Sequence, residues 1–93
     1  MSNQRINERA LAVEIGKIIR RERLARAWTV ERLAAESDRD RNTIMRVESG
    51  TICSRLPVLM DLLWAMDCDQ GVFLEIVAAD AALRLPSALV EAA

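Results

Sequence analysis

Residues 28–50 read Trp28-Thr-Val-Glu-Arg-Leu-Ala-Ala-Glu-Ser-Asp-Arg-Asp-Arg-Asn-Thr-Ile-Met-Arg-Val-Glu-Ser-Gly50, which is two short helical patterns with a polar turn between them. The first pattern follows Thr29, whose hydroxyl can accept a hydrogen bond from an early backbone N–H of a helix. We therefore expect a helix from Val30 to about Glu36. Residues 37–40 include no apolar side chain and are rich in types that bond their own backbone, so the helix is expected to break there.

A second helix is predicted from Arg41 to Ser49. Asp40 is a strong N-cap residue, and Gly50 can take the left-handed conformation that ends a helix. Its inward positions, Ile44 and Val47, lie three residues apart, while the polar side chains around them point elsewhere. Two short helices joined by such a turn, with a polar outer face on the second, have the geometry that fits a helix into the major groove of DNA.

Helical patterns also flank this stretch on both sides. A helix is expected from about Asn7 to Arg26, because apolar residues recur there every three or four positions at Leu11, Ile15, Ile18 and Ile19. A fourth helix is expected to be capped by Ser54, to tolerate Pro57 in its first turn, and to bury a stripe of Leu56, Leu59, Leu62, Leu63 and Met66. Asp69 is expected to cap a fifth helix from about Gln70 to Leu83, which Leu85-Pro86 then interrupts.

Composition excludes most enzyme classes. The chain has 93 residues, enough for one small domain, and includes no histidine, which removes the usual catalytic base and every imidazole ligand. Its two cysteines, Cys53 and Cys68, have a spacing that matches neither a zinc site nor a redox motif, and we interpret them as reduced thiols of the core. We therefore predict a protein that is not an enzyme and has no catalytic residue, cofactor or metal site.

Charge is distributed unevenly along the chain. Residues 1–50 have eleven Lys and Arg against eight Asp and Glu, whereas residues 51–93 have two against six. The first half is the half that can meet an anion such as a phosphate backbone. The start of the chain has no apolar signal core, and acids interrupt the longest apolar stretches, so we expect a cytoplasmic protein with no membrane partner.

A family resemblance follows from the register of these residues. Residues 28–50 resemble the helix-turn-helix of phage repressor and Cro-like proteins, the XRE-type regulators, at Leu33-Ala34, Arg41, Thr43-Ile44, Arg46-Val47-Glu48 and Gly50. The resemblance extends over about residues 15–68, through Ile19, Arg23, Leu56, Leu59 and Met66. It implies an all-α, five-helix lambda-repressor-like DNA-binding fold with a short C-terminal extension. Residues 1–68 are expected to form the helix-turn-helix domain with its N-terminal helix, and residues 69–93 a C-terminal helix and tail that can serve dimerisation or partner binding.

The resemblance also implies site residues. The helix at 41–49 is expected to enter the major groove, with base contacts from Arg41, Asn42 and Met45. The alternative for Met45, which the sequence favours, is a half-exposed side chain that fills a gap. Backbone contacts are expected from Thr29, Arg39, Thr43 and Arg46. Arg23 and Glu48 are expected to form a structural ion pair. The chain is thus predicted to be a sequence-specific transcriptional regulator, a repressor type, that binds double-stranded DNA.

Some positions depart from the family pattern. Asp38 stands where the family has a turn glycine, and we expect it to take a positive φ, which Asp tolerates better than most residues. Ser37 and Arg39 replace apolar residues, so we expect the turn to pack less tightly. Val30 replaces a polar residue that touches a phosphate, so one backbone contact is expected to be missing.

Partners are expected at the C-terminal segment. The apolar residues proposed for a homodimer or partner interface are Val72, Phe73, Ile76, Val77, Leu85 and Leu89; the alternative is that they fold back over the core of their own chain. The acidic second half also leaves open another class of function, a protein-interaction module on the same scaffold that holds a toxin or a regulator, as an antitoxin or antiactivator does.

Overall fold

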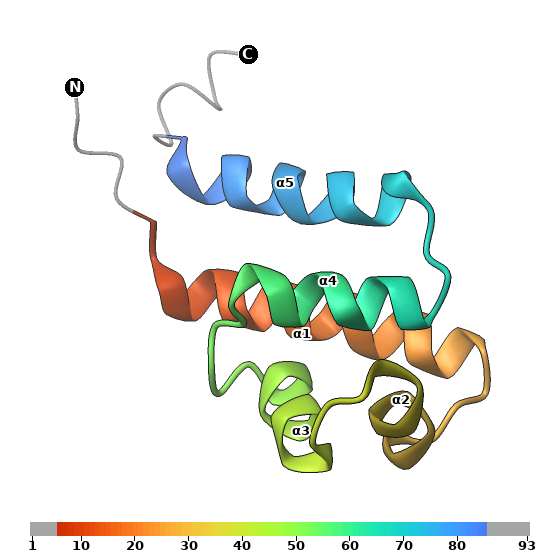
Figure 1. Cartoon of the computed structure of the whole chain (residues 1–93). Helices are drawn as coiled ribbons and strands as arrows, with labels where there is room; N and C mark the ends of the chain where they lie inside the picture. The colour runs from red at the N-terminus through yellow and green to blue at the C-terminus, as the bar shows by residue number, and fades with distance from the viewer. Residues whose placement is uncertain (1–5, 86–93) are drawn as a thin grey trace.

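The computed structural model describes residues 6–85, and every regular element in that range is an α-helix (Figure 1). The five helices of this range are α1 (Glu8–Ala25), α2 (Val30–Ser37), α3 (Arg41–Ser49), α4 (Leu56–Ala65) and α5 (Gln70–Arg84). Their positions agree with the sequence-based expectations to within one or two residues, so the all-α prediction is confirmed. Leu89 lies outside the described residues, as does the remainder of the segment after residue 85.

Side-chain caps begin three of these helices where they were predicted. Thr29 Oγ1 accepts a hydrogen bond of 2.9 Å from the backbone N–H of Arg32, and Asp40 Oδ2 accepts one of 3.1 Å from that of Asn42. Asp69 Oδ1 accepts a bond of 2.8 Å from a backbone N–H at the start of α5. Each of these bonds satisfies a donor that has no partner inside its own helix.

The start of α4 differs from the prediction. Arg55, and not Ser54, is the N-cap residue, and no side chain caps this helix. The hydroxyl of Ser54 instead donates to the carbonyl oxygen of Arg55 at 3.1 Å, because Ser54 lies one residue too early to reach the first turn. Leu56 was expected in the buried stripe but is 59 % exposed, because it opens the helix on the side that faces solvent.

The turn between α2 and α3 is better packed than expected. Asp38 has the left-handed conformation that was predicted, with φ of 56°. Ser37 is buried, and its hydroxyl donates to the carbonyl oxygen of Leu33 at 2.7 Å. A polar side chain is therefore tolerated at this buried position, because a carbonyl oxygen of α2 accepts the hydrogen bond of its hydroxyl.

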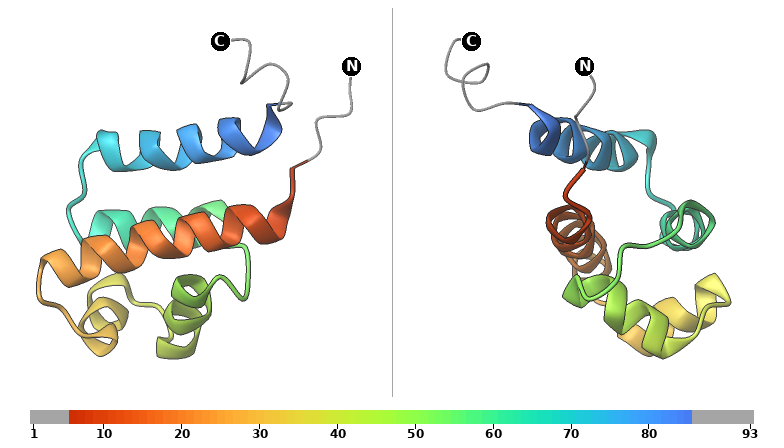
Figure 2. Two further views of the ribbon diagram at one scale, coloured as in Figure 1. Left: turned by 180° about the vertical axis from the view of Figure 1, so that it is seen from behind. Right: turned by 90° about the vertical axis from the view of Figure 1, so that its left-hand side faces the viewer.

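One core joins all five helices. α1 packs against α3 on one side and α5 on the other, while α2 packs against both α3 and α4 (Figure 2). The largest fully buried side chains come from every helix except α5: Ile19, Leu33, Ile44, Val47, Leu62 and Met66. Helix α5 adds Val72 and Ile76 to the same cluster. The result is that α2 and α3 lie together on the side of α1 opposite α5.

No helix within residues 6–85 is both long enough and apolar enough to cross a lipid bilayer. In the same range, no three His, Cys, Asp or Glu side chains converge as metal ligands would. Cys53 and Cys68 are free thiols, and burial raises the pKa of each above its ordinary value. Both thiols therefore stay protonated near neutral pH, which makes them poor nucleophiles.

Candidate nucleic-acid interface

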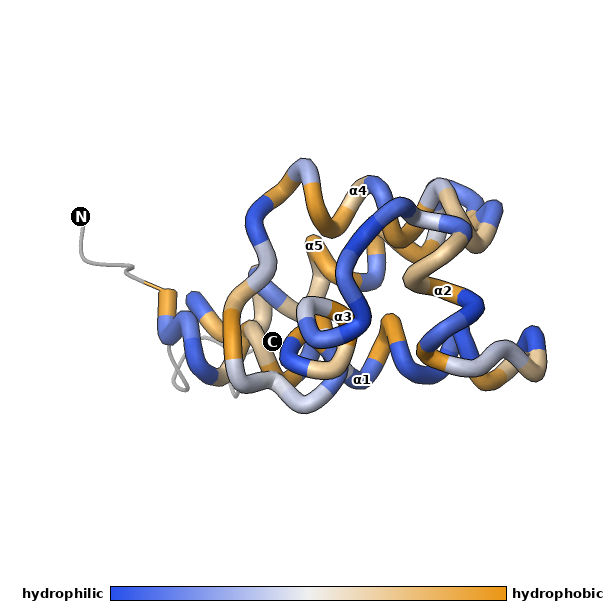
Figure 3. Tube along the Cα trace, turned by 60° about the horizontal axis from the view of Figure 1, so that its bottom comes forward, coloured by the Kyte–Doolittle hydropathy of each residue, from blue (hydrophilic) through white to orange (hydrophobic). Residues whose placement is uncertain are grey.

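Helix α3 has one face in the core and one in solvent. Ile44 and Val47 are almost completely buried. Exposed side chains of the same helix are those of Arg41, Asn42, Met45 and Arg46, together with Ser49 at its last position, and Thr43 is half-buried between the two faces. Figure 3 views the molecule from the side of α2 and α3 and shows a continuous hydrophilic stretch that runs from the turn into the start of α3. We call the exposed side chains of residues 41, 42, 45 and 46 the α3 outer face.

A buried ion pair holds the C-terminal end of α3 against α1. Arg23 donates from Nε to Glu48 Oε2 at 2.6 Å and from Nη2 to Glu48 Oε1 at 2.8 Å. Its remaining donor, Nη1, bonds the carbonyl oxygen of Trp28 at 2.8 Å. Less than a tenth of either charged side chain is exposed. The predicted pair is therefore present, and it limits rotation of α3 relative to α1.

Close backbone contact holds the same end of α3. A Cβ atom at Gly16 of α1 would lie only 2.6 Å from the carbonyl oxygen of Glu48 and closer still to that of Val47. The two helices therefore cross at a point where only glycine fits. Sequence reasoning missed this crossing, although a glycine inside a helical pattern is a known sign of close packing.

Arg41 is held by an acid that sequence reasoning did not connect with it. Its Nε donates to Glu31 Oε2 at 2.5 Å, across the angle between α2 and α3. This hydrogen bond lowers the pKa of the Glu31 carboxyl below its ordinary value. The two residues are ten positions apart on different helices, so only the packing of α2 on α3 brings them together.

The four residues expected at the DNA backbone have different surroundings. Arg39 makes two hydrogen bonds, of 2.9 and 2.5 Å, to Asp61 Oδ2 of α4, another partner that the sequence did not indicate. Thr29 lies exposed at the start of α2 with its oxygen in the cap bond. Arg46 is exposed and makes no ion pair within residues 6–85. Arg46 is thus the cation of the α3 outer face that is most readily available to a phosphate.

The expected interface residues of the C-terminal segment separate into two groups. Val72 and Ile76 are buried in the core of their own chain, so for these two residues the alternative holds and the expected interface with a second chain is wrong. Phe73 is partly buried against the same core, while Val77 and Leu85 are exposed. α5 thus does two things at once: it covers α1 with one face and leaves apolar residues on the other.

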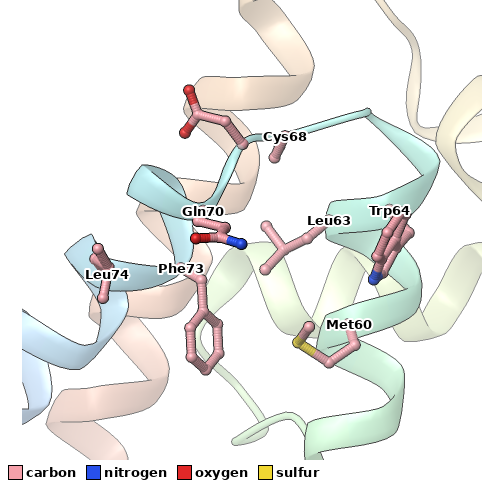
Figure 4. A pocket seen from close by; sticks show the side chains of 8 residues that line it. Met60, Leu63, Trp64, Cys68, Gln70, Phe73 and Leu74 are labelled. Atoms are coloured by element: carbon pink, nitrogen blue, oxygen red, sulfur yellow. The ribbon is translucent and has the colours of Figure 1, made fainter.

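An apolar groove lies between α4 and α5 (Figure 4). Its volume is about 370 Å³, and its lining is mainly Met60, Leu63, Trp64, Phe73 and Leu74. Trp64 is 77 % exposed at its edge. Sequence reasoning gave Trp64 no role, yet a signal was available, because Trp64 is out of phase with the buried stripe of α4. We call this feature the α4–α5 groove.

Comparisons of this chain with family models, with curated proteins and with solved structures found no match. Its function is therefore inferred from the residues of these surfaces and from their geometry.

Proposed function

We propose that this protein binds double-stranded DNA in a sequence-specific manner and acts as a repressor-like transcriptional regulator. The observation that carries the proposal is the division of α3 into two faces. Its inner face is fixed by the core, by Gly16 and by the Arg23–Glu48 pair, and its outer face is polar and open. A helix held in this way keeps a constant pose, and the major groove, about 12 Å wide, admits a helix.

The α3 outer face provides side chains suited to base edges. Arginine can make a bidentate contact with guanine and asparagine with adenine, each worth about 1–3 kcal/mol of discrimination. We assign these contacts to Arg41 and Asn42, in the first turn of α3. Met45, one turn further along, is exposed and can contact a thymine methyl group. Arg46, Thr43, Thr29 and Arg39 are assigned to the phosphate backbone, Arg39 by exchanging Asp61 for a phosphate.

The proposal includes a homodimer. One module makes few phosphate contacts, and its net charge of −1 gives little long-range attraction to DNA. To meet successive major grooves, two copies related by a two-fold axis need their α3 helices about 34 Å apart. Val77 of α5 and Leu85, directly after its end, are apolar and exposed. α5 lies on the side of α1 away from α3, so a second copy bound there leaves the α3 outer face open.

Binding is tested by selecting duplexes from a randomised pool with the purified chain and titrating the selected duplex at several salt concentrations. We expect the affinity to fall with salt, at a log-log slope of about −0.9 per neutralised phosphate. Arg46→Ala should weaken binding to all sequences and reduce this slope by about one contact. Lys17→Ala, which removes an exposed cation on the α5 side of α1, is the matched control and should bind as the unchanged chain does.

Absence of binding to any duplex at low salt would overturn the proposal. The dimer is tested separately by sedimentation of the unchanged chain and of a Val77→Glu, Leu85→Glu variant. We expect the unchanged chain to associate and the variant not to. A chain that stays monomeric at high micromolar concentration would exclude the dimer.

The α4–α5 groove favours a second candidate, a protein-interaction module that holds a partner as antitoxins and antiactivators do. Its exposed tryptophan is of the type that dominates binding energy at protein interfaces. In that case an apolar helix of the partner protein would occupy the groove, away from the α3 outer face. Trp64→Ala separates the two candidates, because it should weaken partner binding and leave DNA binding unchanged.

A further inference from the structure

Arg41 and Arg39 both contact acids, but in different ways. Glu31 bonds only Nε of Arg41, and within residues 6–85 the two terminal nitrogens of that guanidinium have no partner. Asp61 bonds both Nε and Nη2 of Arg39, so that acid occupies one whole side of the fork. A bidentate contact needs two N–H groups of one guanidinium in fixed positions. Arg41 keeps such a pair on its terminal nitrogens while its Nε is held, whereas Arg39 has one side already in use.

Glu31 is itself well placed to hold an arginine. It lies in the first turn of α2, next to the Thr29 cap, where the positive end of the helix favours a carboxylate. The hydrogen bond from Arg41 and one from its own backbone N–H lower the pKa of this carboxyl, so Glu31 stays ionised at neutral pH. Since 53 % of the Arg41 side chain is exposed, the guanidinium is restrained at Nε and still accessible.

The acid also changes which DNA contacts are favourable for Arg41. A free arginine gains binding energy from any phosphate. An arginine that keeps its bond to a carboxylate gains less, because the carboxylate offsets its charge and repels the phosphate, so Arg39 has to release Asp61 before it contacts the backbone. A guanine edge, with its O6 and N7 acceptors, binds the terminal nitrogens and leaves the bond to Glu31 intact.

We infer that Glu31 is a positioning residue that presents the terminal nitrogens of Arg41 to a guanine of the bound DNA and disfavours contact of Arg41 with the phosphate backbone. This inference rests on the proposed function. It makes Glu31 a determinant of specificity although it belongs to α2 and touches no base. It also distinguishes Arg41 from Arg46. Arg46 has no acid partner within the described range and contributes equally to the binding of every DNA sequence.

The test uses the selected duplex, three versions of it in which the guanine assigned to Arg41 is replaced by each other base, and an unrelated duplex. That guanine is identified as the position where Arg41→Ala abolishes the base preference. Glu31→Gln keeps the size of the side chain and removes its charge. We expect it to tighten binding to the unrelated duplex and to reduce the preference for guanine by about threefold to tenfold, the cost of ordering one long side chain.

Asp61→Asn is the matched control, because it removes an equal charge from the partner of Arg39. It should tighten binding to all duplexes alike and leave the guanine preference unchanged. Glu31→Gln should not lower the midpoint of thermal unfolding by more than the control does, since both ion pairs are exposed.

One outcome would overturn the inference while the proposed function stands: Glu31→Gln leaves the guanine preference unchanged, whether or not it tightens binding to every duplex by the same factor. If the unchanged chain binds no duplex at low salt, the proposed function and the inference fail together. If Arg41→Ala changes no base preference although the chain binds DNA, only the role of Arg41 and Glu31 is excluded.

Discussion

The Arg23–Glu48 pair shows how much a single buried contact can matter. Both charges are out of solvent, and the guanidinium also bonds the carbonyl oxygen of Trp28, so each polar atom has a partner. Taking two ions out of water costs several kcal/mol, and only the close bidentate geometry offsets that cost. The pair is therefore better understood as a constraint on the pose of α3 than as a net source of stability.

Removal of one partner is expected to be more harmful than removal of both. Glu48→Leu leaves the Arg23 guanidinium buried without its counter-charge and should lower the free energy of unfolding by about 3–5 kcal/mol. Adding Arg23→Met should recover much of this loss, because no charge then remains buried. Urea unfolding of the two single variants and the double variant measures the coupling. A double variant whose loss equals the sum of the single losses would show that the two charges do not interact.

Gly16 is a second residue on which the pose of α3 depends. Gly16→Ala would place a methyl group against the carbonyl oxygens of Val47 and Glu48, so α1 and α3 must move apart. Although alanine is the better helix former, this overpacking should lower the free energy of unfolding by about 1–3 kcal/mol. Ala25→Gly, at an exposed site near the end of α1, is a control for helix propensity alone. Thermal unfolding measures the effect. An unchanged or higher midpoint of thermal unfolding for Gly16→Ala would show that α1 and α3 pack less closely at this crossing than described.

At the scale of the element, α3 is short and depends on its ends. Its nine residues begin after Asp40, whose carboxylate accepts a backbone bond, and end at Gly50, whose φ is 74°. Isolated helices of this length are not stable in water, so caps and tertiary packing supply the stability that propensity does not. Asp40 and Gly50 were both identified from sequence, because a cap depends only on residues within one turn of it.

A residue that caps a helix and a residue that only resembles a cap in the sequence are expected to differ in how much stability is lost when each is replaced by alanine. Asp40→Ala should lower the free energy of unfolding by about 1 kcal/mol, because it removes an N-cap bond. Ser54→Ala should have almost no effect, because the hydroxyl of Ser54 caps no helix. Thermal unfolding of both variants checks this. A loss at Ser54 as large as that at Asp40 would mean that Ser54 caps α4 after all.

For the whole molecule, a network of charges joins three helices. Arg21 of α1 donates hydrogen bonds to its neighbour Glu22 and to Glu75 of α5. Arg26 donates to Glu22 and to the carbonyl oxygen of Met66 at the end of α4. Burial would raise the pKa of Glu22, but the hydrogen bonds from Arg21 and Arg26 outweigh burial and lower it. Arg21 likewise lowers the pKa of Glu75.

This network predicts a loss of stability in acid. The folded state holds these carboxyls below the unfolded value of about 4.3, so their contribution is complete above that value and is lost as the pH falls through the lower folded pKa. The midpoint of thermal unfolding should change little from pH 7 to about pH 5.5 and fall below about pH 4.5. Glu22→Gln should flatten that fall, whereas Glu36→Gln, on an exposed ion pair, should not. Equal pH profiles for the two variants would contradict this role of Glu22.

The positions of the helices, the caps Thr29, Asp40 and Asp69, and the left-handed residues Asp38 and Gly50 were determined by the sequence itself. These features depend on the conformational preferences of residues within about four positions of one another, and such preferences can be recognised before any fold is known. The pair of Arg23 and Glu48 was found through a family resemblance, although its partners are 25 positions apart.

Tertiary structure alone decided which faces meet. Glu31 meets Arg41 and Asp61 meets Arg39 because α2 packs on α3 and on α4, and Gly16 meets α3 because α1 crosses it. The same packing buries one face of α5 and leaves the α4–α5 groove uncovered. Each of these contacts joins residues that lie far apart in the sequence. The local sequence around one partner does not indicate the other, because the crossing of two helices is determined by the packing of the whole core.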